Sequence, residues 1–255
     1  MKKLMLATLA TLAIGTVAEA APIKIGIGAE PYAPFTSPDA SGNWVGWEID
    51  IANAICKQAA LDCVITPTAW DGIIPALTSG QIDLIINSMS ITPERLKIVD
   101  FSDKYYNAPV MVIVAKDSTA TPDAAGMTGK IIGIQVSTVH EAYVQKYFAP
   151  VAAEVKTYLT QDEEIQDLAA GRVDAVIADS VSLQTYLDTD AGKACCKAAG
   201  MVADDSEILG QGVGIAMRKG EPMKETLNDA IKAIRADGTY DAITRKYFSV
   251  DVYGE

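Results

Sequence analysis

The chain has 255 residues, 49% of them hydrophobic, and carries a formal net charge of −12 at pH 7. This length is enough for one large domain or two of ordinary size. The acidic charge argues against nucleic acid or an anionic membrane as a partner, because both require a basic face. It favours attraction of cations, although an acidic surface can also serve solubility alone.

Residues 1–20 have the features of a secretory signal peptide. Lys2 and Lys3 form a basic start, residues 4–17 are an apolar run, and residues 18–20 (AEA) give a small-x-small cleavage site. The run is too short to span a membrane, and no cysteine follows it as a lipid attachment point. We therefore expect an exported, soluble protein without a lipid anchor, whose mature chain begins near Ala21. A buried N-terminal helix is the alternative.

Strand and helix signals alternate along the mature chain. Strands are expected at residues 23–27, 82–86, 110–115, 131–134 and 213–217, and helices at residues 47–60, 140–147, 180–187 and 223–235. Asp71 is the expected N-cap of a further helix, which precedes the apolar strand at 82–86. Alternation of this kind predicts an α/β fold with mainly parallel strands.

Two segments of the chain, 91 residues apart, are near-copies of each other: 71–88 (DGIIPALTSGQIDLIINS) and 162–179 (DEEIQDLAAGRVDAVIAD). Each predicts a helix, a glycine stop and a short strand that is apolar on both faces. The shared Asp83 and Asp174 are expected to be structural. The two copies diverge at their ends, where the first leads toward Arg95 and the second ends in Asp179.

The pattern of elements restarts near Lys130, which predicts two lobes of similar architecture. We expect residues 21–107 with 209–255 in one lobe and residues 108–208 in the other, with the chain crossing near residues 106–108 and 203–211. Two α/β lobes joined by short crossings make a hinge with a ligand cleft between the strand ends. A single ten-stranded domain is the alternative.

The first copy leads into residues suited to bind a carboxylate. Ser88, Met89 and Ser90 directly follow the buried strand, where hydroxyl and backbone N–H groups can bond an anion. Thr92 and the proline after it start a helix as N-cap and N1. Arg95 lies in the first turn, where a guanidinium can bind a carboxylate by two parallel bonds although its charge opposes the helix dipole. A surface arginine paired with a nearby acid is the alternative.

The second lobe offers the complementary charge. Asp179 stands at the equivalent strand exit, where it can take an ammonium group or merely cap the helix at 180–187. Ser137 and Thr138 follow another strand and open a helix, and such N-termini bind anions. A cationic fork and a carboxylate from two similar halves fit a zwitterionic ligand.

Aromatic and acidic residues occur near the same strand ends. Tyr32 and Trp70 follow strand-like segments and can sandwich a ligand side chain, although core packing is the alternative for each. Glu30 and Glu48 lie close to this region, where either can neutralise a cationic side chain or be solvated.

Cysteine and histidine content limits the covalent and metal chemistry. Four cysteines in an exported chain suggest disulfides. Cys56 and Cys63 flank a short loop, and a bridge between them would contribute roughly 2–3 kcal/mol. Cys195 and Cys196 are adjacent and can be reduced, bonded to each other or modified. No metal or other cofactor is expected, since His140 is the only histidine and no cysteine cluster has zinc spacing.

Several motifs together resemble the periplasmic amino-acid-binding proteins of ABC importers, above all the lysine/arginine/ornithine-, histidine- and octopine/nopaline-binding group. They are residues 45–52 (VGWEIDIA), 71–75 (DGIIP), 88–95 (SMSITPER), 236–240 (ADGTY), 246–248 (KYF) and 251–254 (DVYG). The resemblance spans nearly all of the mature chain. It implies a two-lobed type II (Venus-flytrap) fold, and it matches the Cys56–Cys63 spacing to a disulfide of those relatives.

Carried over by residue, the resemblance implies a ligand site. Arg95 would bind the α-carboxylate with help from Ser90 and from the backbone near Ser88 and Thr138, and Asp179 would bind the α-ammonium. The aromatic residues Tyr32 and Trp70 would stack on the ligand side chain.

This chain departs from the family pattern at the side-chain pocket. The group's distal acidic residue corresponds to Ala29 here, with Glu30 one position later. Glu48 matches a second acid and could compensate. Val139 stands where some relatives have glutamine, which makes this wall more apolar.

The implied function is capture of an L-amino acid, above all a cationic one such as arginine, lysine, ornithine, histidine or an opine, and its delivery to an inner-membrane ABC permease. A monomer is expected. Two alternatives remain. One is an exported enzyme on the same scaffold, resembling cyclohexadienyl or arogenate dehydratase, and the other is a sensory protein that presents its closed form to a receptor.

Overall fold

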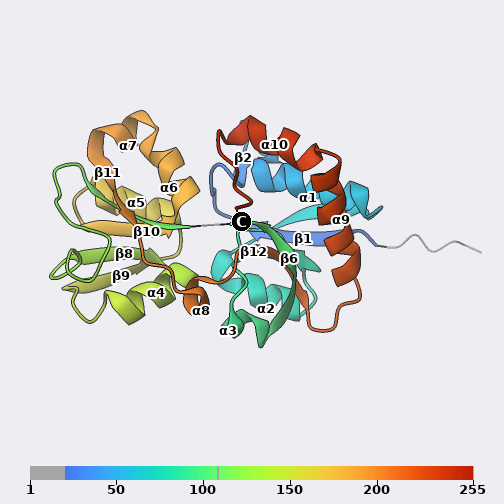
Figure 1. Ribbon diagram of the computed structural model, residues 1–255, viewed down its shortest axis with the longest axis horizontal. Coiled ribbons are helices and arrows are strands. Elements are labelled where there is room, and N and C mark those ends of the chain that lie inside the picture. The colour runs from blue at the N-terminus through green and yellow to red at the C-terminus, as the bar shows by residue number, and fades with distance from the viewer. Residues whose placement is uncertain (1–20, 108, 255) are drawn as a thin grey trace, which may run out of the picture.

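A computed structural model describes residues 21–107 and 109–254, and the expected signal peptide lies outside this part. The described chain forms two lobes side by side, each a five-stranded sheet flanked by helices (Figure 1). The α/β prediction and the division into two lobes are confirmed. Within the described ranges, no helix is both long enough and apolar enough to cross a membrane.

Lobe 1 is built from the start and the end of the chain. Its elements are β1 (Ile23–Gly28), β2 (Ser37–Pro38), β3 (Trp44–Val45), α1 (Trp47–Gln58), β4 (Cys63–Thr68), the 3-10 turn η1 (Trp70–Gly72), α2 (Ile73–Thr78), β5 (Leu84–Ile85), α3 (Pro93–Leu96), β6 (Val99–Tyr106), β12 (Val213–Arg218), α9 (Lys224–Ala236) and α10 (Thr239–Tyr247).

Lobe 2 is built from the middle of the chain. Its elements are β7 (Val110–Ala115), β8 (Ile131–Gln135), α4 (Val139–Tyr147), β9 (Glu154–Tyr158), α5 (Gln161–Ala169), β10 (Ala175–Asp179), α6 (Ser180–Leu187), α7 (Asp190–Cys195), β11 (Cys196–Met201) and α8 (Ser206–Leu209).

The strand order is β4-β1-β5-β12-β6 in lobe 1 and β11-β7-β10-β8-β9 in lobe 2. In each sheet three strands pair in parallel, whereas β12 and β7 run antiparallel to both of their neighbours. The prediction of mainly parallel strands is therefore wrong for half of the pairings. The reason is that β12 and β7 are the strands by which the chain enters each lobe from the other, so they begin at the edge where the parallel strands end.

The cores explain why these segments fold as they do. On α1 the residues Ile51, Ala52 and Ile55 recur at helical spacing and are buried against the lobe 1 sheet together with the apolar face of α9. Val110–Ala115 and Ala175–Asp179 are apolar on both faces because clusters cover both sides of the lobe 2 sheet.

The internal repeat is visible as matched turns. In the first copy the Asp83 N–H donates to the Lys24 carbonyl (2.8 Å), and the Lys24 N–H donates to the Asp83 carboxylate (3.0 Å). In the second copy Asp174 makes the same two bonds with Ile131, at 2.7 and 2.8 Å. Both aspartates are structural, as expected.

The expected helix cap at Asp71 is wrong. Asp71 lies inside the turn Trp70–Gly72, and α2 begins after Gly72 without a side-chain cap. In the second copy the cap is Thr160, which forms a capping box with Glu163. Asp71 and Asp162, which occupy the same position in the two copies, are therefore not the caps of these helices.

Two disulfides are present. Cys56 and Cys63 are joined, with an S–S distance of 2.06 Å, as the family resemblance implied. Cys195 and Cys196 are bonded to each other at the junction of α7 and β11. Of the three states considered for this adjacent pair, which were reduced, bonded to each other or modified, the structure contains the bonded one.

The chain crosses from lobe 1 to lobe 2 between Tyr106 and Val110 and returns between Met201 and Val213. Ile208 and Leu209 of α8 pack on the apolar cluster of lobe 2, next to the predicted boundary at 208/209. We retain the division into 21–107 with 209–255 and 108–208 as our proposal for the domain limits, although α8 packs on lobe 2 as far as Leu209, one residue past this boundary.

Candidate functional site

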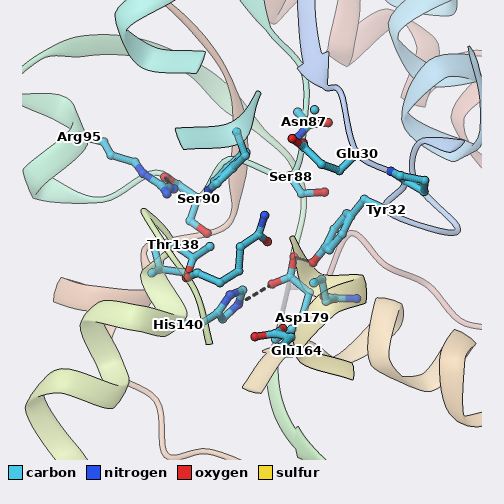
Figure 2. A pocket seen from close by; sticks show the side chains of 17 residues that line it. Glu30, Tyr32, Asn87, Ser88, Ser90, Arg95, Thr138, His140, Glu164 and Asp179 are labelled. Carbon is cyan, nitrogen blue, oxygen red and sulfur yellow. Dashed lines mark hydrogen bonds and ion pairs between the residues drawn. The ribbon is translucent and has the colours of Figure 1, made fainter. Parts of the chain in front are cut away.

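A cavity that is partly open to solvent lies between the two lobes and is lined by both of them (Figure 2). Lobe 1 contributes Gly28, Glu30, Pro31, Tyr32, Trp70, Asn87, Ser88, Ser90 and Arg95. Lobe 2 contributes Gln135, Thr138, Val139, His140, Gln161, Glu164, Ala178 and Asp179. Most of the residues predicted from sequence are therefore brought together at one place.

Arg95 supplies the positive charge of the cavity. Its position is set by Thr92, whose hydroxyl accepts from the Arg95 N–H and caps α3 as expected. One terminal nitrogen donates to the Ser90 carbonyl (3.1 Å), and the other reaches the Ser137 carbonyl of lobe 2 (3.4 Å). The guanidinium carbon lies 5.8 Å from the Trp70 ring centroid.

The electrostatics of Arg95 suit anion binding. Burial lowers the pKa of Arg95 to about 10, so the group remains charged at neutral pH. Among the ion pairs within the described ranges, none involves Arg95. The alternative of a surface arginine paired with an acid is thus not supported. Two of its five N–H groups have protein partners, which leaves donors for a ligand carboxylate.

Asp179 supplies a buried carboxylate from the end of β10. Although it occupies the N-cap position of α6, its side chain makes no capping bond. Instead Oδ2 accepts from the Tyr32 hydroxyl (2.8 Å) and Oδ1 lies 3.0 Å from His140 Nε2 (Figure 2). The bond from Tyr32 joins the two lobes. Each carboxylate oxygen has more than one lone pair, so Asp179 can accept further bonds from an ammonium group.

Glu48 is not a cavity residue, which corrects its expected role in side-chain selectivity. It is fully buried within lobe 1. Its carboxylate accepts from the N–H and the hydroxyl of Ser88, at 2.7 and 3.1 Å, and from the hydroxyl of Tyr105. Burial raises the pKa of Glu48 to about 7 against the lowering effect of these bonds. Ser88 has a φ of 50°, a strained backbone conformation that the bonds to Glu48 hold in place.

Two further predicted contacts are placed differently from expectation. Met89 does not line the cavity, because its side chain is buried in the apolar cluster around α2. The N–H of Ser137 is taken by the Glu141 carboxylate at 2.7 Å, so it is not free for an anion. Ser137 instead contributes its carbonyl to Arg95. Thr138 caps α4 and lines the cavity together with Val139.

The predicted aromatic and acidic walls are both present. Tyr32 stacks on Phe35 with ring centroids 5.6 Å apart, and its ring also faces the cavity. The side chains of Glu30 and Asn87 both lie close to Gly28. A Cβ built on that glycine would be 3.5 Å from Glu30 Oε2 and 3.3 Å from Asn87 Nδ2. Gly28 thus leaves the space in which these two side chains approach the cavity.

Several lining residues were missed from the sequence, above all His140, Gln161 and Glu164. The repeat contains a signal for Gln161, because the 91-residue offset aligns it with Trp70, which is a predicted site residue of lobe 1. It gives no warning for Glu164, which aligns with the core residue Ile73. From the sequence, His140 is recognisable only as the single histidine and as the start of a helix. Within residues 21–107 and 109–254 no group of three or more metal-ligating side chains is found.

The arrangement can hold a small zwitterion between a guanidinium of lobe 1 and a carboxylate of lobe 2. A family model, that of the bacterial extracellular solute-binding proteins, family 3, matches residues 23–250. The chain is 41% identical to the L-arginine-binding protein of Pseudomonas aeruginosa, over 100% of this chain and 99% of that protein. It is 40% identical to the histidine-binding periplasmic protein of Salmonella typhimurium, over the whole of both chains. A solved structure of an ancestral arginine-binding protein bound to arginine superposes with a TM-score of 0.80 at 36% identity, covering 89% of this chain and 98% of that one.

Proposed function

Because the chain belongs to family 3 of the bacterial extracellular solute-binding proteins, we propose that it is a periplasmic receptor for an L-amino acid with a cationic side chain, such as arginine, lysine, ornithine or histidine. The observation that carries this proposal is the cavity that pairs Arg95 of lobe 1 with Asp179 of lobe 2. The names of the relatives support it, since they are arginine-, histidine- and lysine/arginine/ornithine-binding proteins.

The binding mode follows from the two charges. Arg95 takes the α-carboxylate, with Ser90 and the backbone around Thr138 beside it, and Asp179 takes the α-ammonium. Tyr32 and Trp70 flank the side chain. Since the two charged contacts lie on different lobes, the complete site exists only when the lobes are closed on each other, and closure excludes water from both ion pairs.

Removal of either charge tests this mode. Arg95→Ala and Asp179→Ala each leave one charge of the bound amino acid buried and unpaired, which costs on the order of 2–5 kcal/mol of binding free energy. We expect a loss of L-arginine affinity of more than tenfold by isothermal titration calorimetry. Arg245→Ala, an exposed arginine on α10, is the matched control. Arginine binding by Arg95→Ala within twofold of wild type would show that the site is assigned wrongly.

The role beyond binding is proposed from the family. We propose export by the signal peptide, action as a monomer and delivery of the ligand to an inner-membrane ABC permease. Uptake of radiolabelled arginine by cells that lack the gene tests the delivery, and uptake unchanged from that of the parent strain contradicts it.

We propose further that the chain, like the relatives named above, is a binding protein and not an enzyme. Prephenate and arogenate incubated with the purified protein should yield no aromatic product. A sensory role differs only in the partner that recognises the closed form.

A further inference from the structure

The first turn of α5 places two polar side chains, Gln161 and Glu164, three positions apart on the face that lines the cavity. Gln161 is 7% exposed, and Glu164 is fully buried. The repeat aligns Glu164 with Ile73, which is part of the apolar core of lobe 1. Lobe 2 thus has a carboxyl group where the matching lobe has an isoleucine, and burial of a carboxylate is unfavourable unless it meets a cation or hydrogen-bond donors.

Glu164 and Gln161 have acceptor atoms without partners. Both carboxyl oxygens of Glu164 and the amide oxygen of Gln161 lack a hydrogen-bond partner among the described residues. The backbone of Gln135 lies near enough to lower the pKa of Glu164 against the larger effect of burial, but it makes no hydrogen bond of normal geometry to the carboxyl group. The amide nitrogen of Gln161 donates to Ser182 Oγ at 2.8 Å, which fixes the amide and leaves its oxygen available.

The unpartnered atoms of the cavity wall favour a ligand rich in donors. Asn87 Oδ1, in lobe 1, is a further buried acceptor without a partner. Among the described residues that line the cavity, Trp70 Nε1 is the single buried donor without a partner. Four acceptor oxygens thus stand against one donor. A guanidinium presents five N–H groups and an alkylammonium three, so a cationic group can satisfy several of these oxygens at once.

The charges of the cavity lead to the same ligand chemistry. Arg95 is the one lysine or arginine among its lining residues, and His140 is already paired with Asp179. Once Arg95 holds the α-carboxylate and Asp179 the α-ammonium, no cation remains for Glu164. In Figure 2 Glu164 lies beneath Asp179, toward the side of the cavity opposite Arg95.

We propose that Glu164, with Gln161 beside it, forms the lobe 2 subsite that receives the distal cationic group of the bound amino acid. The inference rests on the proposed function and adds to it the residue that selects the side chain. The subsite is closely packed against β8, because a Cβ built on Gly133 would lie 3.4 Å from the Glu164 Cβ, at contact distance. Specificity for a cation then comes from the lobe that meets the ligand on closure, in place of the acid missing at Ala29.

L-arginine and L-citrulline test this subsite, because the two amino acids have nearly the same shape and only arginine carries a distal charge. Wild type and Glu164→Gln are titrated calorimetrically with both. We expect Glu164→Gln to weaken arginine binding at least tenfold and citrulline binding less than threefold. Asp162→Asn, an exposed acid on the same helical turn, is the matched control and should change both affinities less than twofold. Glu30→Gln tests the rival acid of lobe 1, and thermal melts establish that every variant is folded.

The other outcomes distinguish failure of the subsite from failure of the proposed function. If wild type binds arginine and Glu164→Gln keeps that affinity within twofold, the subsite is wrong while the proposed function stands. The same holds if Glu30→Gln alone removes the preference for arginine, or if Glu164→Gln weakens arginine and citrulline equally, which indicates a structural role. If wild type binds none of arginine, lysine, ornithine, histidine and citrulline, the proposed function itself fails.

Discussion

Two buried carboxyl groups of similar environment have different tasks because their partners differ. Glu48 and Glu164 are both fully buried. Glu48 accepts bonds from Ser88 and Tyr105, so its acceptors are satisfied within lobe 1 and it acts as a positioning residue for the strained Ser88 backbone. Glu164 has no such bonds. A buried carboxyl group whose acceptors are satisfied positions the backbone around it, whereas an unsatisfied one at a cavity wall indicates a ligand.

The burial of Glu164 without partners predicts how the stability of the protein depends on pH. Burial raises the pKa of Glu164 well above its ordinary 4.5. Asp179, His140, Tyr32, Glu30 and Arg95 line the cavity with it, and Tyr158 on β9 lies close enough for Glu164 to raise its pKa. Neither Arg95 nor any other cation is among the groups that shift the pKa of Glu164. Above about pH 4.5 the folded chain therefore holds a proton that the unfolded chain has released. The free energy of unfolding consequently falls as pH rises through this window.

Glu164→Gln removes this contribution. In the absence of amino acids, we expect the melting temperature of the variant to exceed that of wild type by a margin that grows as the pH rises above about 4.5. Circular dichroism melts measure it. Glu48, whose pKa burial raises to about 7, acts in the same direction but is present in both proteins and cancels in the difference. A margin that is constant across this pH range would contradict the prediction.

At the scale of elements, pattern and capping rules identified most helices and strands but not their directions. Residues 110–115 and 180–187 coincide with β7 and α6, because apolar runs and helical spacing are local signals. The antiparallel course of β7 and β12 depends on which edge of the sheet the chain enters from, and this is set only by the assembly of two lobes. The prediction of a helix cap at Asp71 was wrong because a 3-10 turn, which contains Asp71, precedes α2.

The aspartates shared by the repeat should matter for stability and not for binding. Asp83→Ala and Asp174→Ala each leave a backbone N–H without its carboxylate partner, which costs about 1–2 kcal/mol of unfolding free energy. Asp83→Ala should cost more, because Asp83 also pairs with Arg218 at 3.1 Å. Denaturant titrations measure both values, and arginine affinity should stay within twofold. A tenfold loss of affinity without loss of stability would place these residues in the site instead.

At the scale of the molecule, the sequence predicted the two charged residues of the proposed zwitterion clamp but not the residues of the proposed side-chain subsite. Arg95 and Asp179 follow strands whose ends meet in the cleft, so the repeat and the family motifs located them. Glu164 and Gln161 come from a helix face that meets the cavity only after the sheet of lobe 2 has packed. Glu48 carries a charge that suggests binding, yet its burial within lobe 1 could not be foreseen from its position in the chain.

The lobes are joined across the cavity by the hydrogen bond from Tyr32 to Asp179, which predicts a measurable shift in closure. A bond to a carboxylate contributes about 1.5–3 kcal/mol, so Tyr32→Phe should lower the ratio of closed to open molecules in the absence of ligand by about one to two orders of magnitude. Single-molecule energy transfer between dyes on the two lobes measures this ratio. Saturating arginine should restore closure in the variant, because the bound zwitterion then bridges Arg95 and Asp179. Tyr247→Phe is the matched control, since the Tyr247 hydroxyl bonds Asp50 at 3.1 Å within lobe 1 alone. Identical distributions for Tyr32→Phe and wild type without ligand would mean that this bond does not hold the lobes together.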